Sequence, residues 1–437
     1  MRRPVPGDPM SLTPRLDLRG GRDCWRDDAT PQILADAPPA TPVDVAIIGA
    51  GVTGAILADR LVASGRSVVL IDRRPPATGS TAASTALVLW APDVPLVDHI
   101  ARFGTQGAGA RWRAVYQAVA HLDARVRALG LDCGWVARPD LYLPGDVLDA
   151  QGLRREADAR QAAGLPSAWM DGGDVSRTFG LSAPAAILSE GAWSVDPVAL
   201  TRGLLRQVQA AGARVLFPVD VTALHEDEDG VSLEVAGVGS LRAAQVIVAT
   251  GYEAGADLGP GFTLGSSFAI ASPPGQAEAW REHAMIWEAG DPYLYFRTTP
   301  DGRLVVGGED EDFADPVRRD AMIPQKARRL AEKARARLTL PSFDIDRAWA
   351  ATFGSSGDGL PAIGPRPGSR RTFLAHSFGG NGIAFASLAA GLLQQALSGA
   401  PHPLAAAFAP DRFTPMTGSG TAGAGHGSQT SPEEDAP

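Results

Sequence analysis

Cysteine and lysine are both scarce in this chain of 437 residues. The two cysteines, Cys24 and Cys133, cannot form a disulfide framework or a multi-cysteine metal site, and such low use is typical of a reducing compartment. Lysine occurs only at Lys326 and Lys333, in one charged repeat that predicts a solvated helix face. A buried Schiff-base lysine, and with it pyridoxal-phosphate chemistry, is therefore disfavoured.

Long apolar runs and an excess of positive charge are also missing. No stretch reaches the roughly 18 consecutive apolar residues that span a bilayer, so we expect no transmembrane segment. No apolar stretch follows Arg2 and Arg3, which predicts no secretory signal and a cytoplasmic protein. The 40 basic and 49 acidic residues give a net charge of −9, so we expect no nucleic-acid partner.

Other catalytic patterns are absent as well. The sequence shows no Ser-His-Asp spacing, no metal-ligand spacing and no Gly-Lys-Ser/Thr phosphate loop. We therefore expect no bound metal, and hydrolase and kinase activities have no support. With 45% hydrophobic and 20% charged residues, the composition is that of a globular protein of two to three domains.

A glycine-rich turn, Gly49 to Gly54, lies between a predicted strand and a predicted helix, and Asp72 ends the next predicted strand. Gly49 permits the tight turn, Gly51 lets the backbone approach a pyrophosphate, and Gly54 lets the helix pack on the strand. The helix N-terminus offers N–H groups to the phosphates, and Asp72 can accept a hydrogen bond from a ribose hydroxyl. The pattern predicts a dinucleotide site.

The type of dinucleotide depends on residues farther along the chain. Arg73 and Arg74 leave a 2′-phosphate and hence NADP open, although such arginines are more often solvated surface charges. A buried strand that ends at Thr250-Gly251, and a second glycine turn before the helix of residues 381–397, favour FAD. The positive end of this second helix would stabilise the negative charge of a reduced flavin.

These motifs, in this order and spacing, resemble the FAD-dependent D-amino-acid oxidase superfamily, which includes glycine oxidase, sarcosine oxidase and amino-acid dehydrogenases. The resemblance covers roughly Asp44 to Phe413. Further marks of it are the segments 79–87, 307–311 and 358–361, and Cys24-Trp25 in the N-terminal arm.

The resemblance implies an α/β fold in which a Rossmann-type FAD-binding domain is interleaved with an antiparallel-sheet substrate domain. Residues 1–40 are predicted to form an N-terminal arm and residues 413–437 a disordered tail, because the tail has little apolar content. The predicted FAD-binding domain comprises residues 41–95, 195–258 and 347–412, and the predicted substrate domain comprises residues 96–194 and 259–346.

The resemblance also implies which residues bind FAD. They belong to the first glycine turn, the segment after it, the late strand end and the second glycine turn: Gly49, Gly51, Val52, Thr53, Gly54, Asp72, Arg73, Thr81, Ala82, Ser84, Val221, Thr250, Gly251, Gly379, Gly380, Asn381, Gly382 and Ile383. The region where sarcosine oxidases attach flavin through cysteine contains none here, so we expect non-covalent FAD. Leu89-Trp90-Ala91 replaces an expected Gln-Tyr-Glu, which removes polar groups near the flavin.

The predicted substrate end includes a strand in which Tyr293, Tyr295 and Arg297 alternate onto one face. Arg297 could bind a carboxylate bidentately, with Tyr295 and Tyr252 as further catalytic candidates. The alternative for Arg297 is the wet face of an edge strand. Glu309 and Asp310, which follow the neighbouring strand, could meet an amine, although an acidic turn is the commoner explanation.

The predicted activity is oxidation of a C–N bond in a small amine or amino acid. A hydride passes to flavin N5, the imine hydrolyses, and oxygen or a quinone or other electron carrier reoxidises the flavin. One alternative is a flavin-dependent reductase or monooxygenase of another class. The other is a non-catalytic FAD-binding partner protein.

Overall fold

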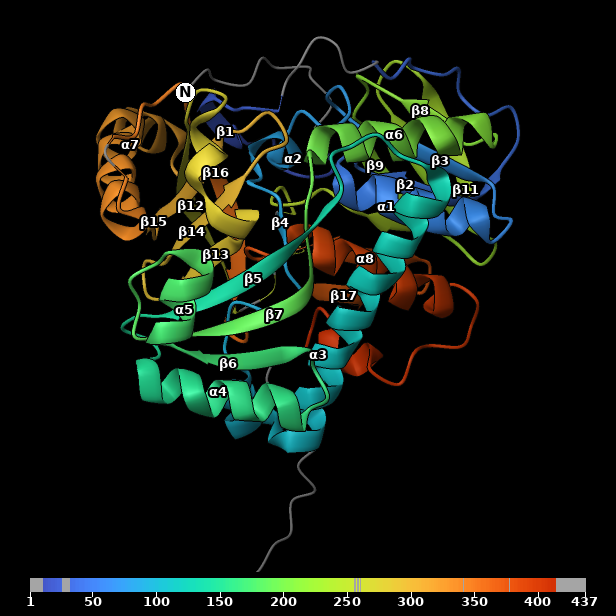
Figure 1. Ribbon diagram of the computed structural model, residues 1–437. Helices are drawn as coiled ribbons and strands as arrows, with labels where there is room; N and C mark the ends of the chain where they lie inside the picture. Colours follow the sequence, from blue (N-terminus) through green and yellow to red (C-terminus); the bar gives the residue numbers. More distant parts are fainter. Residues whose placement is uncertain are drawn as a thin grey trace, which may run out of the picture.

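The computed structural model describes residues 11–25, 32–254, 257, 259, 261–340, 342–376 and 378–413 (Figure 1). Apart from Phe413, the predicted tail of residues 413–437 lies outside them. Within the described residues, no helix combines the length and the apolar character needed to cross a bilayer.

An eight-stranded sheet, called sheet B here, forms around the first predicted strand. Its strands run in the order β17-β18-β11-β2-β3-β8, and β9 and β10 form a meander beside β11. Strands β18, β11, β2, β3 and β8 are parallel. β3 and β18 are buried throughout and the other three are buried at their carboxyl ends, where their residues are apolar. The strands are β2 (Val43–Ile48), β3 (Val68–Ile71), β8 (Arg214–Leu216), β9 (Val221–Glu226), β10 (Val231–Val235), β11 (Gly239–Val248), β17 (Ala362–Pro365) and β18 (Thr372–His376).

A second sheet of ten strands, called sheet A, lies beside sheet B (Figure 1). Its order is β1-β16-β12-β15-β14-β13-β5-β7-β4, with β6 paired to β7, and only the β13–β5 pair is parallel. The strands are β1 (Arg19–Arg22), β4 (Leu87–Val88), β5 (Val136–Pro144), β6 (Ser167–Asp171), β7 (Ala185–Ser194), β12 (Phe262–Ala271), β13 (Met285–Ala289), β14 (Leu294–Thr298), β15 (Leu304–Glu311) and β16 (Arg347–Ser356).

The helices cover both sheets. In chain order, the α-helices are α1 (Val52–Ala63), α2 (Ser80–Ala83), α3 (Leu96–Leu129), α4 (Ala150–Ala162), α5 (Gly172–Phe179), α6 (Pro197–Ala210), α7 (Pro316–Leu338) and α8 (Gly382–Ala396). The short 3-10 helices are η2 (Gln276–Ala279), η3 (Arg281–His283) and η4 (Ala405–Phe408).

The fold class predicted from the sequence is confirmed, since one sheet is Rossmann-type and the other mainly antiparallel. The sheet to which a strand belongs differs from the predicted domain boundaries in three places. Strands β4 and β16 join sheet A, although the sequence assigned them to the FAD-binding domain. The N-terminal arm also contributes a strand, because β1 pairs with β16 at the sheet edge.

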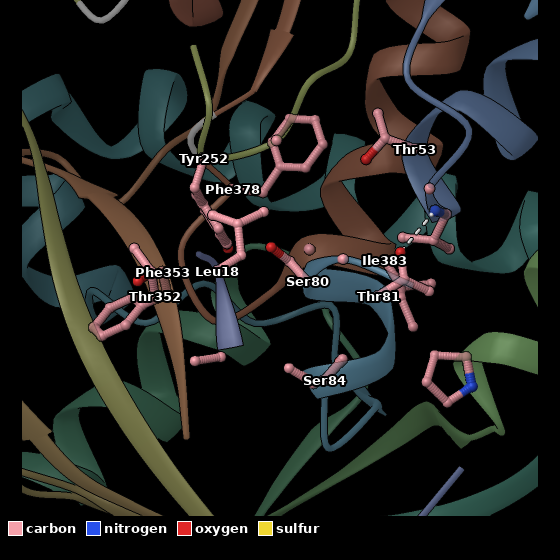
Figure 2. Close-up of a pocket in the computed structure, with 18 of the residues that line it drawn as sticks. Leu18, Thr53, Ser80, Thr81, Ser84, Tyr252, Thr352, Phe353, Phe378 and Ile383 are labelled. Atoms are coloured by element: carbon pink, nitrogen blue, oxygen red, sulfur yellow. Dashed lines mark hydrogen bonds between the residues drawn. The ribbon is translucent and has the colours of Figure 1, made fainter. Parts of the chain in front are cut away.

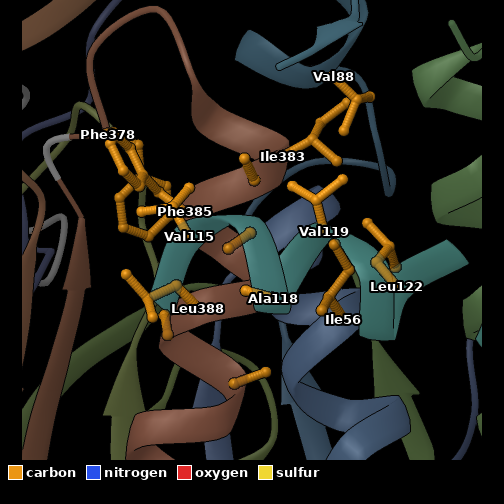
Figure 3. Close-up of a cluster of buried hydrophobic side chains, with 14 of the residues drawn as sticks. Ile56, Val88, Val115, Ala118, Val119, Leu122, Phe378, Ile383, Phe385 and Leu388 are labelled. Carbon is orange, nitrogen blue, oxygen red and sulfur yellow. The ribbon is translucent and has the colours of Figure 1, made fainter. Parts of the chain in front are cut away.

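Helix α3 joins the two halves of the protein. It breaks at Gly104, which has a φ of 72°, outside the helical region. Figure 3 shows Val115, Val119 and Leu122 of α3 packed over Ile56 of α1 and residues of α8. The predicted substrate segment and the dinucleotide-binding segment therefore share one hydrophobic core.

Helix α4 is tied to the start of α3 by a buried carboxylate. Glu156 accepts hydrogen bonds from the backbone N–H groups of Leu96 (3.0 Å) and Val97 (2.9 Å), and it pairs with Arg160 at 2.7 Å. Both side chains of the ion pair are fully buried. Glu156 thus satisfies free N–H groups at the N-terminus of α3 and neutralises a buried guanidinium.

We predict that Glu156→Gln lowers the free energy of unfolding by about 3 kcal/mol, because it leaves the Arg160 charge buried without its partner. Asp158→Asn is the matched control, since Asp158 forms an exposed pair with Arg154 on the same helix. Urea denaturation of both variants measures the difference. Equal midpoints for the two variants would contradict a structural role for the buried pair.

Candidate active site

A deep cavity runs from the carboxyl ends of the parallel strands of sheet B to one face of sheet A. Figure 2 shows Ser80 and Thr81 of α2, and Ser84 directly after it, on one side of this cavity, with Tyr252 and Phe378 on the other. Ligands of open α/β sheets bind at the carboxyl ends of the strands, so this is the expected position for a dinucleotide.

The first glycine turn is shaped by close backbone contacts. Gly49 has a φ of 119°, and a Cβ there would lie 2.3 Å from the carbonyl oxygen of Ala249. A Cβ at Gly54 would lie 1.9 Å from the carbonyl oxygen of Gly49, so α1 can pack on β2 only with glycine at this position. Gly51 borders the cavity, and the atom nearest to a Cβ placed there would be the Thr81 hydroxyl oxygen. This hydroxyl accepts a hydrogen bond from the Val52 N–H (Figure 2).

Asp72 borders the cavity where the sequence predicts a ribose ligand. Its carboxylate accepts hydrogen bonds from the backbone N–H groups of Ala50 (2.7 Å) and Arg74 (2.8 Å). Burial raises the pKa of Asp72, and these two hydrogen bonds oppose that shift. The turn and the acidic residue thus form one unit before any ligand binds.

The two arginines after Asp72 hold the N-terminal arm in place. Arg73 donates hydrogen bonds to the carbonyl and hydroxyl oxygens of Thr13, and Arg74 forms an ion pair with Glu253 (2.6 Å) and donates to the carbonyl of Leu16. These bonds occupy guanidinium donors that the sequence left open for a 2′-phosphate. The arm also brings Leu18 to the cavity wall (Figure 2).

The second glycine turn is held by Asp93, which the sequence did not single out. Asp93 accepts hydrogen bonds from the Gly380 N–H (3.0 Å) and the Asn381 side-chain amide (2.9 Å). Its side chain is open to the cavity but enclosed by protein, and this burial raises its pKa. It lies 287 residues from Gly380 in the chain, and no local pattern links the two.

The structure brings most of the predicted FAD-binding residues to the cavity wall. Gly54 and Ala82 do not reach it, because Gly54 packs on β2 and Ala82 faces a small core with Trp25. The predicted residues that line the cavity are Gly49, Gly51, Val52, Thr53, Asp72, Arg73, Thr81, Ser84, Val221, Thr250, Gly251, Gly379, Gly380, Asn381, Gly382 and Ile383.

Tyrosines and an acidic residue line the sheet A end of the cavity. Tyr252 donates a hydrogen bond to the carbonyl of Gly379 (3.1 Å), and the Tyr295 hydroxyl lies 3.3 Å from the Ser267 hydroxyl. Burial raises the pKa of both phenols, so they remain protonated donors at neutral pH. Burial also raises the pKa of Asp310 to about 7.

Arg297 does not lie where the sequence predicts it. The alternation is correct for Tyr295, but the strand advances by about 6.6 Å over two residues, and Arg297 is not part of the cavity wall. Its fully buried guanidinium donates to the backbone carbonyls of Thr298, Thr85, Ala86 and Val195 at 2.6–3.1 Å. Burial lowers its pKa to about 10, so it stays charged. Arg297 therefore connects strands and loops and is not a carboxylate fork.

Comparison with known proteins identifies the family. The model of the FAD dependent oxidoreductase family, DAO, matches residues 44–396. The chain belongs to this family. It is thus an FAD-dependent oxidoreductase, and the predicted relationship to D-amino-acid oxidases is confirmed.

Several solved structures share the fold. Glycine oxidase from Geobacillus kaustophilus is 20% identical, with a TM-score of 0.68 over 85% of this chain and 99% of that one. L-Amino acid deaminase from Proteus myxofaciens, in complex with anthranilate, is 14% identical, with a TM-score of 0.72 over 91% of this chain and 99% of that one.

A curated relative is the tRNA 5-methylaminomethyl-2-thiouridine biosynthesis bifunctional protein MnmC of Burkholderia thailandensis. It is 27% identical over 424 residues, which cover 85% of this chain. The chain spans 59% of the length of that relative.

The cavity of this oxidoreductase fits FAD. The hydroxyl oxygens of Ser80 and Thr250 border it, are buried and have no hydrogen-bond partner among the described residues. A buried hydroxyl without a hydrogen-bond partner costs folding free energy unless a ligand supplies the missing bond. The N-termini of α1 and α8 both border the cavity, which suits the phosphates and the electron-accepting ring. No cysteine or histidine is among the described residues that line it, so we still predict non-covalent FAD.

We predict that purified protein contains FAD in near-stoichiometric amount and that Gly51→Val loses nearly all of it. The valine side chain would occupy the space beside Thr81 where the backbone must approach the pyrophosphate. The ratio of flavin to protein absorbance measures this. Gly391→Ala in α8 is the control, since a Cβ there meets nothing within 4 Å and should leave the flavin content unchanged.

We predict that Arg297→Ala impairs folding and does not act selectively on substrates. Each of the buried carbonyls that loses its donor costs about 1–3 kcal/mol, so the thermal midpoint should fall strongly. Arg297→Lys should restore part of it, because an ammonium can reach some of the same oxygens. An unchanged midpoint together with a selective loss for carboxylate substrates would restore the original prediction for Arg297.

Proposed function

We propose that this oxidoreductase oxidises a C–N bond of a small amine or amino acid. In the proposed reaction the α-carbon gives up a hydride, the nitrogen lone pair forms a C=N bond, and water then hydrolyses the imine. FAD, when bound, supplies the two-electron acceptor for the hydride. Oxygen or a quinone or other carrier is the proposed final acceptor.

The observation that carries this proposal is the continuity of the dinucleotide cavity with an end lined by Tyr252, Tyr295 and Asp310. The Tyr295 phenol can donate a hydrogen bond to a small polar molecule, and the Tyr252 phenol, whose hydrogen is donated to the Gly379 carbonyl, can accept one. The reacting amine must be neutral, and Asp310 is the group at this end that can take its proton. Glycine oxidase and L-amino acid deaminase, which share the fold, are named for amino acids and support the same chemistry.

The name of the curated relative suggests a second candidate substrate. A methylaminomethyl group is an alkylamine carried on a nucleoside, so an RNA-borne amine would present the same reacting group. The net charge of −9 favours a small molecule over a polynucleotide. That nucleic acid is not a partner therefore stays a prediction, which a comparison of free amines with transfer RNA would test.

We predict that anaerobic mixing of the FAD-loaded protein with a panel of amines and amino acids bleaches the visible flavin absorbance. Alcohols of the same carbon skeleton are the matched controls and should leave the flavin oxidised, since they offer C–O in place of C–N. Bleaching by a nicotinamide cofactor, with no response to any amine, would support the reductase or monooxygenase alternative instead.

A further inference from the structure

The substrate end of the cavity carries negative charge and no positive charge. Asp93 and Asp310 both border it. Among the described residues of the cavity wall, Arg73 and Arg74 are the cationic side chains, and both are bound to the N-terminal arm at the other end. A carboxylate brought to this end would therefore meet like charge without a counter-ion, which costs free energy.

A β-bulge brings Asp310 to the cavity. In the pairing of β12 with β15, Ser266 lies opposite Glu311 and Phe268 lies opposite Gly308. One residue of β12, Ser267, therefore lies opposite two residues of β15, Glu309 and Asp310. Bulges commonly re-aim a side chain beside a functional site. Here Asp310 and Ser267 both border the cavity, and the Oδ1 atom of Asp310 is buried with no hydrogen-bond partner among the described residues.

The bulge is strained and is held from behind. Glu309 adopts a φ of 59°, a left-handed conformation that is rare for a residue with a side chain. Lys326 of α7 donates to the Glu309 carbonyl at 2.9 Å and lies 3.3 Å from its carboxylate, and Lys333 forms a second ion pair with it. Lys326 is only 3% exposed, so the predicted solvated face was wrong for this lysine. These contacts stabilise the bulged backbone conformation that brings Asp310 to the cavity wall.

Tyr295 and a further tyrosine, Tyr293, complete the surroundings, and each lies close to a glycine. A Cβ at Gly307 would lie 2.2 Å from the ring of Tyr295, and one at Gly380 would lie 2.9 Å from the Tyr293 hydroxyl. The rings of Tyr293 and Tyr295 lie 5.4 Å apart between centroids. Tyrosine faces beside a carboxylate form the kind of environment that attracts an alkylammonium ion.

We propose that this end of the cavity selects a cationic amine that bears no carboxylate, with Asp310 as its counter-ion and the tyrosines against its alkyl groups. The inference rests on the proposed function and narrows it, because an α-amino acid becomes the disfavoured substrate. Asp93 is not the counter-ion, since both its oxygens already accept hydrogen bonds from the second glycine turn. Asp310 alone combines a buried, unpartnered carboxylate oxygen with a position on the substrate wall among the described residues.

The raised pKa of Asp310 gives the proposal a pH dependence. Burial is the main cause, and the charges that reach Asp310 are those of Asp93 and Asp291, which raise its pKa, and of Lys326, which lowers it. The carboxyl is neutral below about pH 7 and negative above it, so cation binding should strengthen between about pH 6 and pH 8. The same profile should be much flatter in Asp310→Asn.

The test uses tetramethylammonium and acetate as probes of the FAD-loaded protein at constant ionic strength. Tetramethylammonium cannot be oxidised, so calorimetry and the shift of the flavin spectrum report binding alone. We expect tetramethylammonium to bind and acetate not to bind at equal concentration. Asp310→Asn should weaken tetramethylammonium binding about tenfold or more, and Asp310→Glu should retain part of it.

Asp312→Asn is the matched control, since Asp312 is exposed, lies two residues away and is outside the cavity wall. It removes the same charge and should leave tetramethylammonium binding unchanged. Tighter binding of acetate than of tetramethylammonium would overturn the proposal. So would equal tetramethylammonium binding by wild type and Asp310→Asn.

A second arm of the test compares ethylmethylamine with N-methylglycine. The two molecules are the same except that ethylmethylamine has a methyl group where N-methylglycine has a carboxylate. We expect ethylmethylamine to bleach the flavin faster at equal concentration. Faster bleaching by N-methylglycine would overturn the inference and leave the proposed C–N oxidation intact. Binding of tetramethylammonium that depends on Asp310, without bleaching by any amine, would overturn the proposed function and leave the cation site intact.

Discussion

The contact between Gly54 and Gly49 is the constraint on which the rest of the molecule depends. A Cβ at Gly54 would lie 1.9 Å from the Gly49 carbonyl, so α1 can begin directly against β2 only because no side chain stands there. This contact directs the N-terminus of α1, with its free N–H groups, at the cavity. Sheet A then encloses the other end of the same space.

The buried charges of this protein divide into two kinds. Arg297, Arg160 and Lys326 are held by backbone carbonyls or carboxylates and are not part of the cavity wall. Asp310 differs, because one of its oxygens has no partner among the described residues and the side chain borders the cavity. A buried carboxylate oxygen that lacks a partner and lies on a cavity wall marks the place for a ligand.

The substrate end thus depends on structural support from the far side of sheet A. Glu309 and Asp310 are neighbours in the chain, but Glu309 contacts the lysines of α7 whereas Asp310 borders the cavity. Helix α7 holds Glu309 by ion pairs, and this fixes the bulge that places Asp310 in the cavity. A substitution on the outer helix can therefore change the site without touching it.

The sequence by itself indicated the dinucleotide half of the site, the strands and helix around its first glycine turn, and the helix after the second. The turn from Gly49 to Gly54 and Asp72 lie within 24 residues, and their spacing follows from the local geometry of a strand, a tight turn and a helix. Local patterns of this kind are readable because neighbouring residues alone decide them. The period-2 pattern likewise placed Tyr295 on the correct face of β14.

Only the tertiary structure decided what occupies the substrate end. Alternation says which face Arg297 shares with Tyr295 but not where the cavity ends along that face, and the carbonyls that bind Arg297 come from loops about 100 and 200 residues away. Asp93 reaches Gly380 across 287 residues, and Asp310 reaches the cavity through a bulge that no composition signal announces. Contacts between distant segments depend on how the two sheets pack, and that packing is a property of the whole chain.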